Sequence, residues 1–103
     1  MTRDELLPRY AAGERDFRNA DLQGVDLEWE DLSRVDLSGA NLSGANLQHA
    51  DLFRATLTGA NLSGANLTDA NLIRANLSGA NLTRTNLAEA HLYGALLPEG
   101  FKP

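Results

Sequence analysis

Leucine recurs at every fifth position through most of the chain, and this spacing constrains the fold more than any other feature. Sixteen consecutive units carry it, at positions 22, 27, 32, 37, 42, 47, 52, 57, 62, 67, 72, 77, 82, 87, 92 and 97. Phe17 extends the register by one unit toward the N-terminus. The residue two positions before each Leu is Ala in twelve of the sixteen units, the exceptions being Val25, Glu30, Val35 and Thr85. The residue directly before each Leu is usually Asp or Asn. The repeating unit therefore reads Ala-(Asp/Asn)-Leu-x-x.

A period of five fits neither regular secondary structure. Five residues of an α-helix advance by about 500°, so successive Leu side chains would drift around the helix axis. On a straight strand, odd spacing places alternate Leu side chains on opposite faces. A chain that turns in the same sense every five residues instead directs each Leu, and the small residue two positions before it, toward one shared axis. The spacing predicts a coiled chain whose core consists of Leu and Ala.

The positions that face outward repeat every twenty residues, which is four units. Two adjacent series show this spacing: Arg34, Arg54 and Arg74, and beside them Phe53, Ile73 and Tyr93. Four units per coil predict an all-β, quadrilateral β-helix whose coils pair as strands about 4.8 Å apart. Chains of L-residues favour right-handed winding. Seventeen units then make about four coils.

The run of Ala-(Asp/Asn)-Leu-x-x units over about residues 15–97 resembles the pentapeptide-repeat family, whose signature is this unit. The resemblance implies a right-handed quadrilateral β-helix, in agreement with the fold inferred from the period. We expect an N-terminal cap over residues 1–14, the β-helix over 15–97, and a C-terminal tail or cap over 98–103.

A stack of coils has exposed edges at both ends, so caps are expected. Thr2 begins a capping-box sequence, and Pro8 predicts a short or kinked helix. Leu6, Leu7 and Tyr10 are the side chains expected to cover the first coil.

At the other end, Phe101 is expected to fold over the last coil. If that cap is incomplete, the C-terminal end becomes a dimer interface, so we expect a monomer or a weak dimer.

Several positions within the repeat have structural interpretations. Asp and Asn side chains before each Leu bond to the local backbone and fix the turn, and columns such as Asn41/Asn61/Asn81 are candidates for amide ladders between coils. Glycines in the x-x pair suit corners that need positive φ.

Glu30 occupies an inward position that is Ala in most units, so either its side chain bends outward or its coil is irregular. The hydroxyl of Thr85 can bond to the backbone.

The sequence carries no sign of catalysis. It contains no Cys and no phosphate-binding loop, zinc-protease or serine-hydrolase motif, and an axis filled with Leu leaves no deep cavity for a substrate. We therefore predict no enzyme activity, no cofactor and no metal.

One outer column (Trp29, His49, Asp69 and Glu89) could bind a metal weakly. It lacks the closed shell of a structural zinc site, so we favour a solvated ladder with a His49–Asp69 contact.

The candidate partner-binding face joins an arginine series to an apolar strip: Arg34, Arg54, Arg74, Phe53, Ile73 and Tyr93. Exposed apolar groups beside Arg are typical of protein interaction sites. Repulsion within the arginine series is expected to be offset by Asp31 and Asp51 on the same side. The alternative is an ordinary solvated face, because scattered apolar surface residues are common.

Charge and hydropathy restrict the partners. A net charge of −5 and a pI near 4.8 argue against direct nucleic-acid binding. No apolar run approaches the roughly 20 residues of a membrane span, and the N-terminus lacks the pattern of a signal peptide. These features predict a cytoplasmic protein with a protein partner.

The predicted function is a non-catalytic structural or protein-interaction module. The resemblance implies an alternative, because some family members mimic duplex DNA, bind type II topoisomerases and confer quinolone resistance. This chain departs from them in having about four coils, in the three arginines, and in a short segment 98–103. Its acidic residues are also concentrated in residues 14–36.

Overall fold

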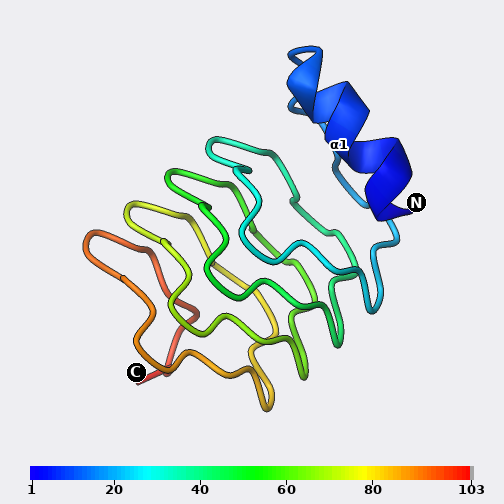
Figure 1. The fold of residues 1–103 in the computed structure, drawn as a ribbon. Coiled ribbons are helices and arrows are strands. Elements are labelled where there is room, and N and C mark those ends of the chain that lie inside the picture. The colour runs from blue at the N-terminus through cyan, green and yellow to red at the C-terminus, as the bar shows by residue number, and fades with distance from the viewer. Residues whose placement is uncertain (103) are drawn as a thin grey trace.

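The computed structural model describes residues 1–102 and consists of one helix followed by a stack of four-sided coils (Figure 1). The helix, α1 (Arg3–Ala11), covers one end of the stack, and the C-terminus lies at the other end. Isolated parallel bridges join each Asp or Asn position to the residue twenty later, from Asp16↔Asp36 to Asn76↔Leu96. The predicted coil of twenty residues is thereby confirmed.

Backbone hydrogen bonds connect successive coils on every side. The N–H of Leu22 donates to the carbonyl of Asn41 at 2.8 Å, and the N–H of Asn41 donates to the carbonyl of Ala20 at 2.9 Å. The same pattern recurs along the stack to Leu77, whose N–H donates to the Leu96 carbonyl at 2.7 Å. Each coil is therefore held by its two neighbours through a ladder of parallel β-type bonds.

The core is the predicted column of Leu with Ala filling the spaces between. Every Leu of the repeat from Leu22 to Leu77 is at most 1% exposed, and the inward alanines from Ala40 to Ala75 are equally buried. Burial of each Leu contributes about 1.5–3 kcal/mol, so the Leu column is the main stabilising contribution to the stack. Thr85, at one of the inward Ala positions, donates its hydroxyl to the Leu62 carbonyl at 2.7 Å, as predicted.

Each corner is a turn in which the residue three positions after a Leu donates its N–H to that Leu's carbonyl, as Ala45 does to Leu42 at 3.0 Å. The Asp or Asn before the Leu accepts the N–H two residues further on, as Asn61 does from Ser63 at 3.0 Å. The side chains before each Leu thus fix the turn, as predicted.

The expected amide ladder through Asn41, Asn61 and Asn81 is absent from residues 1–102. Among residues 1–102 the Asn amide groups that reach between coils donate to acids of the preceding coil. Nδ2 of Asn46 and of Asn71 lies 3.3 Å from Asp26 Oδ1 and from Asp51 Oδ1, respectively, and Nδ2 of Asn46 also lies 3.4 Å from Glu28 Oε1. The Asn Oδ1 atoms are already engaged by their own turns, so the carboxylate, with more acceptor capacity, is the better partner.

Helix α1 closes the N-terminal end as expected. Leu6 is fully buried against the core, with Leu7 and Tyr10 packed partly buried beside it. The expected capping box is present at the start of the helix, where the Glu5 carboxylate accepts the Thr2 backbone N–H at 3.0 Å. Pro8 lies inside the helix, which continues to Ala11, so the helix is short without ending at the proline.

Glu30 bends out of the coil toward α1, which is one of the two expected outcomes. Its Oε2 accepts a hydrogen bond from Nη2 of Arg3 at 3.0 Å, and this bond raises the pKa of Arg3. The coil itself stays regular, because the Glu30 carbonyl still accepts the Asp51 N–H at 2.9 Å. The alternative of an irregular coil is therefore wrong, since a long side chain can leave the core without moving the backbone.

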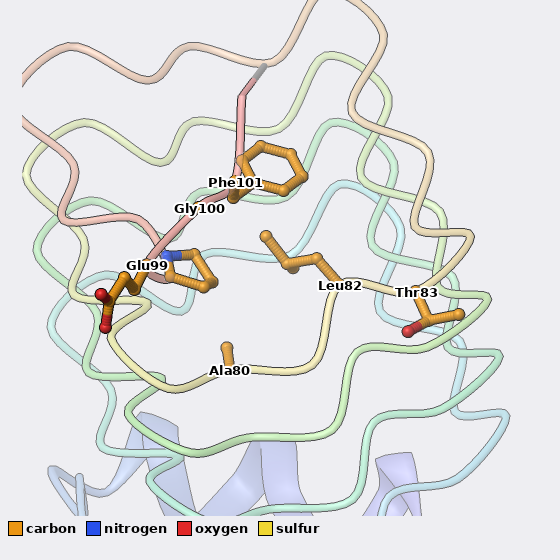
Figure 2. A pocket seen from close by; sticks show the side chains of 7 residues that line it. Ala80, Leu82, Thr83, Glu99, Gly100 and Phe101 are labelled. Carbon is orange, nitrogen blue, oxygen red and sulfur yellow. The ribbon is translucent and has the colours of Figure 1, made fainter.

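The C-terminal end is covered only in part. Residues 98–101 turn back across it, with the Phe101 N–H donating to the Pro98 carbonyl at 3.1 Å. Figure 2 shows Phe101 above Leu82, with Ala80 below them. These side chains line an open hollow of about 350 Å³. Phe101 folds over the last coil as expected, whereas residue 103 of the expected tail lies outside the described residues.

No helix within residues 1–102 combines the length and apolar character needed to cross a bilayer.

Replacing Leu52 with Ala should lower the free energy of unfolding by about 2–5 kcal/mol, because it opens a cavity in a column that cannot collapse. Thr58→Ala at an exposed turn position is the matched control and should change stability by less than about 0.5 kcal/mol. Urea unfolding followed by circular dichroism measures both variants. Equal stability of the two would contradict a tightly packed axis.

Candidate functional site

The third residue of nearly every turn lies in the left-handed region, and its side chain differs between the four corners of the coil. Two corners are mainly Gly. The other two hold larger side chains with φ between 56° and 66°: Arg34, Arg54, Arg74, and Trp29, His49, Asp69 and Glu89. A non-Gly residue in this region costs about 1–2 kcal/mol. Backbone strain of this kind is most often found at functional sites, so these two corners are the candidates.

The first of these corners forms what we call the arginine face: Arg34, Arg54, Arg74, Phe53, Ile73 and Tyr93. The Phe53 ring lies near two guanidinium groups, whose central carbons are 5.7 Å (Arg34) and 5.5 Å (Arg54) from the ring centroid. At these distances the ring quadrupole attracts each cation, and this attraction opposes the repulsion between them. The arginines are exposed, Phe53 and Ile73 are half-buried, and Tyr93 is 75% exposed. The structure brings all six predicted residues onto one side of the stack, spaced one coil apart.

The expected offset by Asp31 and Asp51 is not formed as ion pairs. The Asp31 carboxylate accepts the Ser33 N–H at 3.0 Å, and Asp51 accepts the Phe53 N–H at 3.0 Å. Both acids are therefore engaged in fixing turns. Within residues 1–102, no carboxylate lies within 4.0 Å of a guanidinium nitrogen of the arginine face. Its three cations are free to pair with an external anion.

The second corner forms a short stack of side chains. The Trp29 and His49 rings lie parallel, with centroids 3.9 Å apart and planes 6° apart. His49 Nε2 lies 3.7 Å from Asp69 Oδ2, which confirms the predicted contact. The part of the chain that the structure describes contains no group of three His, Cys, Asp or Glu side chains arranged to hold a metal. The geometry is that of a solvated ladder with one aromatic stack.

One contact to the arginine face could not be predicted from the repeat. The Tyr10 hydroxyl donates to the Ser33 carbonyl at 2.7 Å, and the Arg15 guanidinium lies 3.7 Å from the Tyr10 ring centroid. Helix α1 therefore abuts the unit that begins the arginine series. Tyr10 lies outside the five-residue register, so the repeat does not predict this contact. The apolar character of Tyr10 is the one sequence feature that pointed to it.

Comparisons with known proteins agree with this architecture. A family model described as pentapeptide repeats matches residues 31–69 and 65–98, with eight copies. The crystal structure of a pentapeptide repeat protein from Nostoc PCC 7120 is 40% identical, covers 98% of this chain and 88% of that chain, and has a TM-score of 0.87. A search of curated protein sequences gives no match.

Two further solved structures are less similar. A pentapeptide repeat protein from the Arabidopsis thaliana thylakoid lumen is 34% identical over 78% of this chain and 63% of that chain, with a TM-score of 0.55. The fluoroquinolone resistance protein QnrB1 is 19% identical over 76% of this chain and 60% of that chain, with a TM-score of 0.26. The Nostoc and Arabidopsis structures identify the fold as the predicted right-handed quadrilateral β-helix.

Exchanges between Gly and larger corner residues should measure the corner strain. Gly59 has φ of 68° and open space around its missing Cβ, so Gly59→Ala should destabilise the fold by about 1 kcal/mol through backbone strain alone. Arg74→Gly should be more stable than Arg74→Ala by a similar amount, because Ala keeps the strain that Gly relieves. Thermal unfolding of the three variants tests this, and equal stability of the two Arg74 variants would show that the corner is unstrained.

Proposed function

The chain belongs to the pentapeptide repeat family, and from its corner geometry we propose that it is a non-catalytic protein-interaction module whose partner binds along the arginine face. The supporting observation is that three arginines occupy left-handed corners, at φ of 56° to 61°, where Gly relieves the strain at other corners. A fold selected only for stability gains nothing from a charged side chain there.

The chemistry of the face indicates the kind of partner. It offers three exposed guanidinium groups beside Phe53, Ile73 and the largely exposed Tyr93. Within residues 1–102 these cations have no acidic neighbour in ion-pair range. Arginine and aromatic side chains contribute most of the binding energy in many protein interfaces. The matching surface is an acidic protein segment that also carries apolar side chains. A nucleic acid is a poorer match, because the net charge of −5 repels a polyanion.

Mimicry of DNA toward a type II topoisomerase is the alternative, and the distribution of charge supports it less well. Eight of the fourteen acidic residues lie in residues 14–36, and the equivalent positions in the second half are mostly Asn. The arginine face interrupts any continuous negative surface along the stack. A mimic of duplex DNA needs negative charge along its length.

Capture of partners from a lysate with immobilised protein tests the proposal. The variant Arg34→Gly/Arg54→Gly/Arg74→Gly removes the cations and relieves corner strain, so it should fold at least as well as wild type. We expect a partner that binds wild type and is retained at least tenfold less by this variant. Retention should also fall as the salt concentration rises, because the contact is ionic.

A charge-matched control separates the face from net charge. The variant Arg18→Ala/Arg84→Gly/Lys102→Ala also removes three cations, all exposed and outside the arginine face, and should retain the partner. Loss of binding in both variants would mean that only net charge matters. Retention of a topoisomerase by both variants, with inhibition of its supercoiling activity, would favour the mimic instead.

A further inference from the structure

The arginine face consists of two adjacent series that run along the stack with one member in each coil. Parallel pairing joins residues twenty apart on this side, from Asp31↔Asp51 to Asn71↔His91, so neighbouring members of a series lie about 4.8 Å apart. The three arginines therefore span about 9.6 Å. The apolar strip has the same length, but it begins one coil later than the arginine series does. The two series are thus side by side and staggered by one coil.

The face is bounded at both ends. Toward α1, the apolar strip is preceded by Ser33, whose carbonyl accepts the Tyr10 hydroxyl at 2.7 Å. Toward the C-terminus, the arginine series is followed by Gly94, where a Cβ would lie 3.1 Å from Cγ of Arg74. The Arg74 side chain therefore extends across this glycine. From the first arginine to the last apolar residue the face covers three coil steps, or about 14.4 Å.

Backbone groups on this face are engaged within the stack. Each arginine N–H donates to the carbonyl of the apolar residue in the next coil, as that of Arg54 does to Ile73 at 3.0 Å. The Ile73 N–H donates to Asn71 Oδ1 at 3.0 Å, and the Phe53 N–H donates to Asp51 Oδ1 at 3.0 Å. An extended partner gains its affinity from free N–H and C=O groups at a sheet edge. Recognition on this face instead depends on side chains.

We propose that the partner segment is an α-helix that lies along the stack, with an acidic stripe against the arginine series and an apolar stripe against the apolar strip. This inference rests on the proposed function and adds the conformation of the partner to it. A helix bonds its own backbone groups and presents side chains alone. Its acidic stripe complements three arginines that have no carboxylate within 4.0 Å in the part of the chain that the structure describes.

The spacing of the face matches a helix better than an extended chain. Residues i, i+4 and i+7 of a helix lie on one side and span about 10.5 Å, which is within about 1 Å of the length of the arginine series. Three side chains on one side of an extended segment span about 13.6 Å, which is about 4 Å too long.

The stagger of the two series fits a helix as well. One coil step is about 4.8 Å, and one helical turn is about 5.4 Å. A helix therefore meets both series when its apolar stripe lies one turn before its acidic stripe, at positions i−4, i−1 and i+3. These positions form a stripe directly beside i, i+4 and i+7 on the helix surface.

A designed peptide tests the conformation of the partner. The probe is a fluorescein-labelled peptide of about 18 residues, mostly Ala and Gln, with three Glu and three Leu at the positions given above. An Ala-rich chain of this length populates the helix. The matched control carries Pro in place of one central Ala away from both stripes, which breaks the helix and keeps every contacting side chain. Fluorescence anisotropy at low salt should show at least tenfold tighter binding of the helical peptide to the full-length protein.

Two protein variants assign the stripes. The triple glycine variant of the arginine series should lose at least tenfold in affinity for the helical peptide. Ile73→Ser/Tyr93→Ser keeps the arginines and shortens the apolar strip, and Ser already occupies the equivalent position 33. This variant should bind the helical peptide at least threefold more weakly. It should also bind a peptide with Gln in place of the three Leu as well as wild type does.

The outcomes separate the helical partner from the proposed function. Equal affinity of wild type for the helical and proline peptides, lost in both cases with the triple glycine variant, would overturn the helix and leave the arginine face as the binding surface. Unchanged binding in Ile73→Ser/Tyr93→Ser would overturn the two-stripe arrangement, and no binding of the helical peptide up to about 1 mM would overturn the inference as a whole. Failure of the proposed function is seen separately, as equal capture of a lysate partner by wild type and the triple glycine variant.

Discussion

Everything in this fold depends on one backbone constraint, a left-handed residue at the third position of nearly every five-residue turn. That conformation turns the chain in the same sense each time, so four turns close a square and the fifth unit lies on the first. Burial of Leu at the axis and bonding between coils both follow from this closure. The constraint also explains why the candidate functional side chains lie at corners. A side chain at a corner is exposed, and because its backbone is left-handed it lowers the stability of the fold.

The regular part of the structure could be predicted from the sequence because its causes are local and repeated. Leu every five residues required an axis, and the twenty-residue spacing of Arg34, Arg54 and Arg74 required four sides. The same register placed Trp29 beside His49 and His49 beside Asp69. In each case a contact between coils reduces to a difference in residue number, so periodicity alone locates the neighbours.

Contacts made by long side chains could not be predicted in this way. Asp31 and Asp51 lie on the same side as the arginines, yet they bond to their own turns, because a backbone N–H two residues away is always within reach. The Phe53 ring is the group that the Arg34 and Arg54 guanidinium groups approach instead. The reach of Tyr10 to the Ser33 carbonyl depends on how α1 docks, which the repeat does not encode. The extent of cover at the C-terminal end depends on the path of residues 98–101, which the repeat does not encode either.

The two ends of the stack, one covered by α1 and the other open at the last coil, also differ in local stability. Each coil is stabilised only by its neighbours, so the free energy of opening a coil depends on how many neighbours it has. The last coil has one neighbour and a partly exposed Leu at each side, whereas the first coil is pressed between the next coil and Leu6. Unfolding should therefore begin at the C-terminal coil and proceed toward the helix, one layer at a time, in the manner of an unzipping stack.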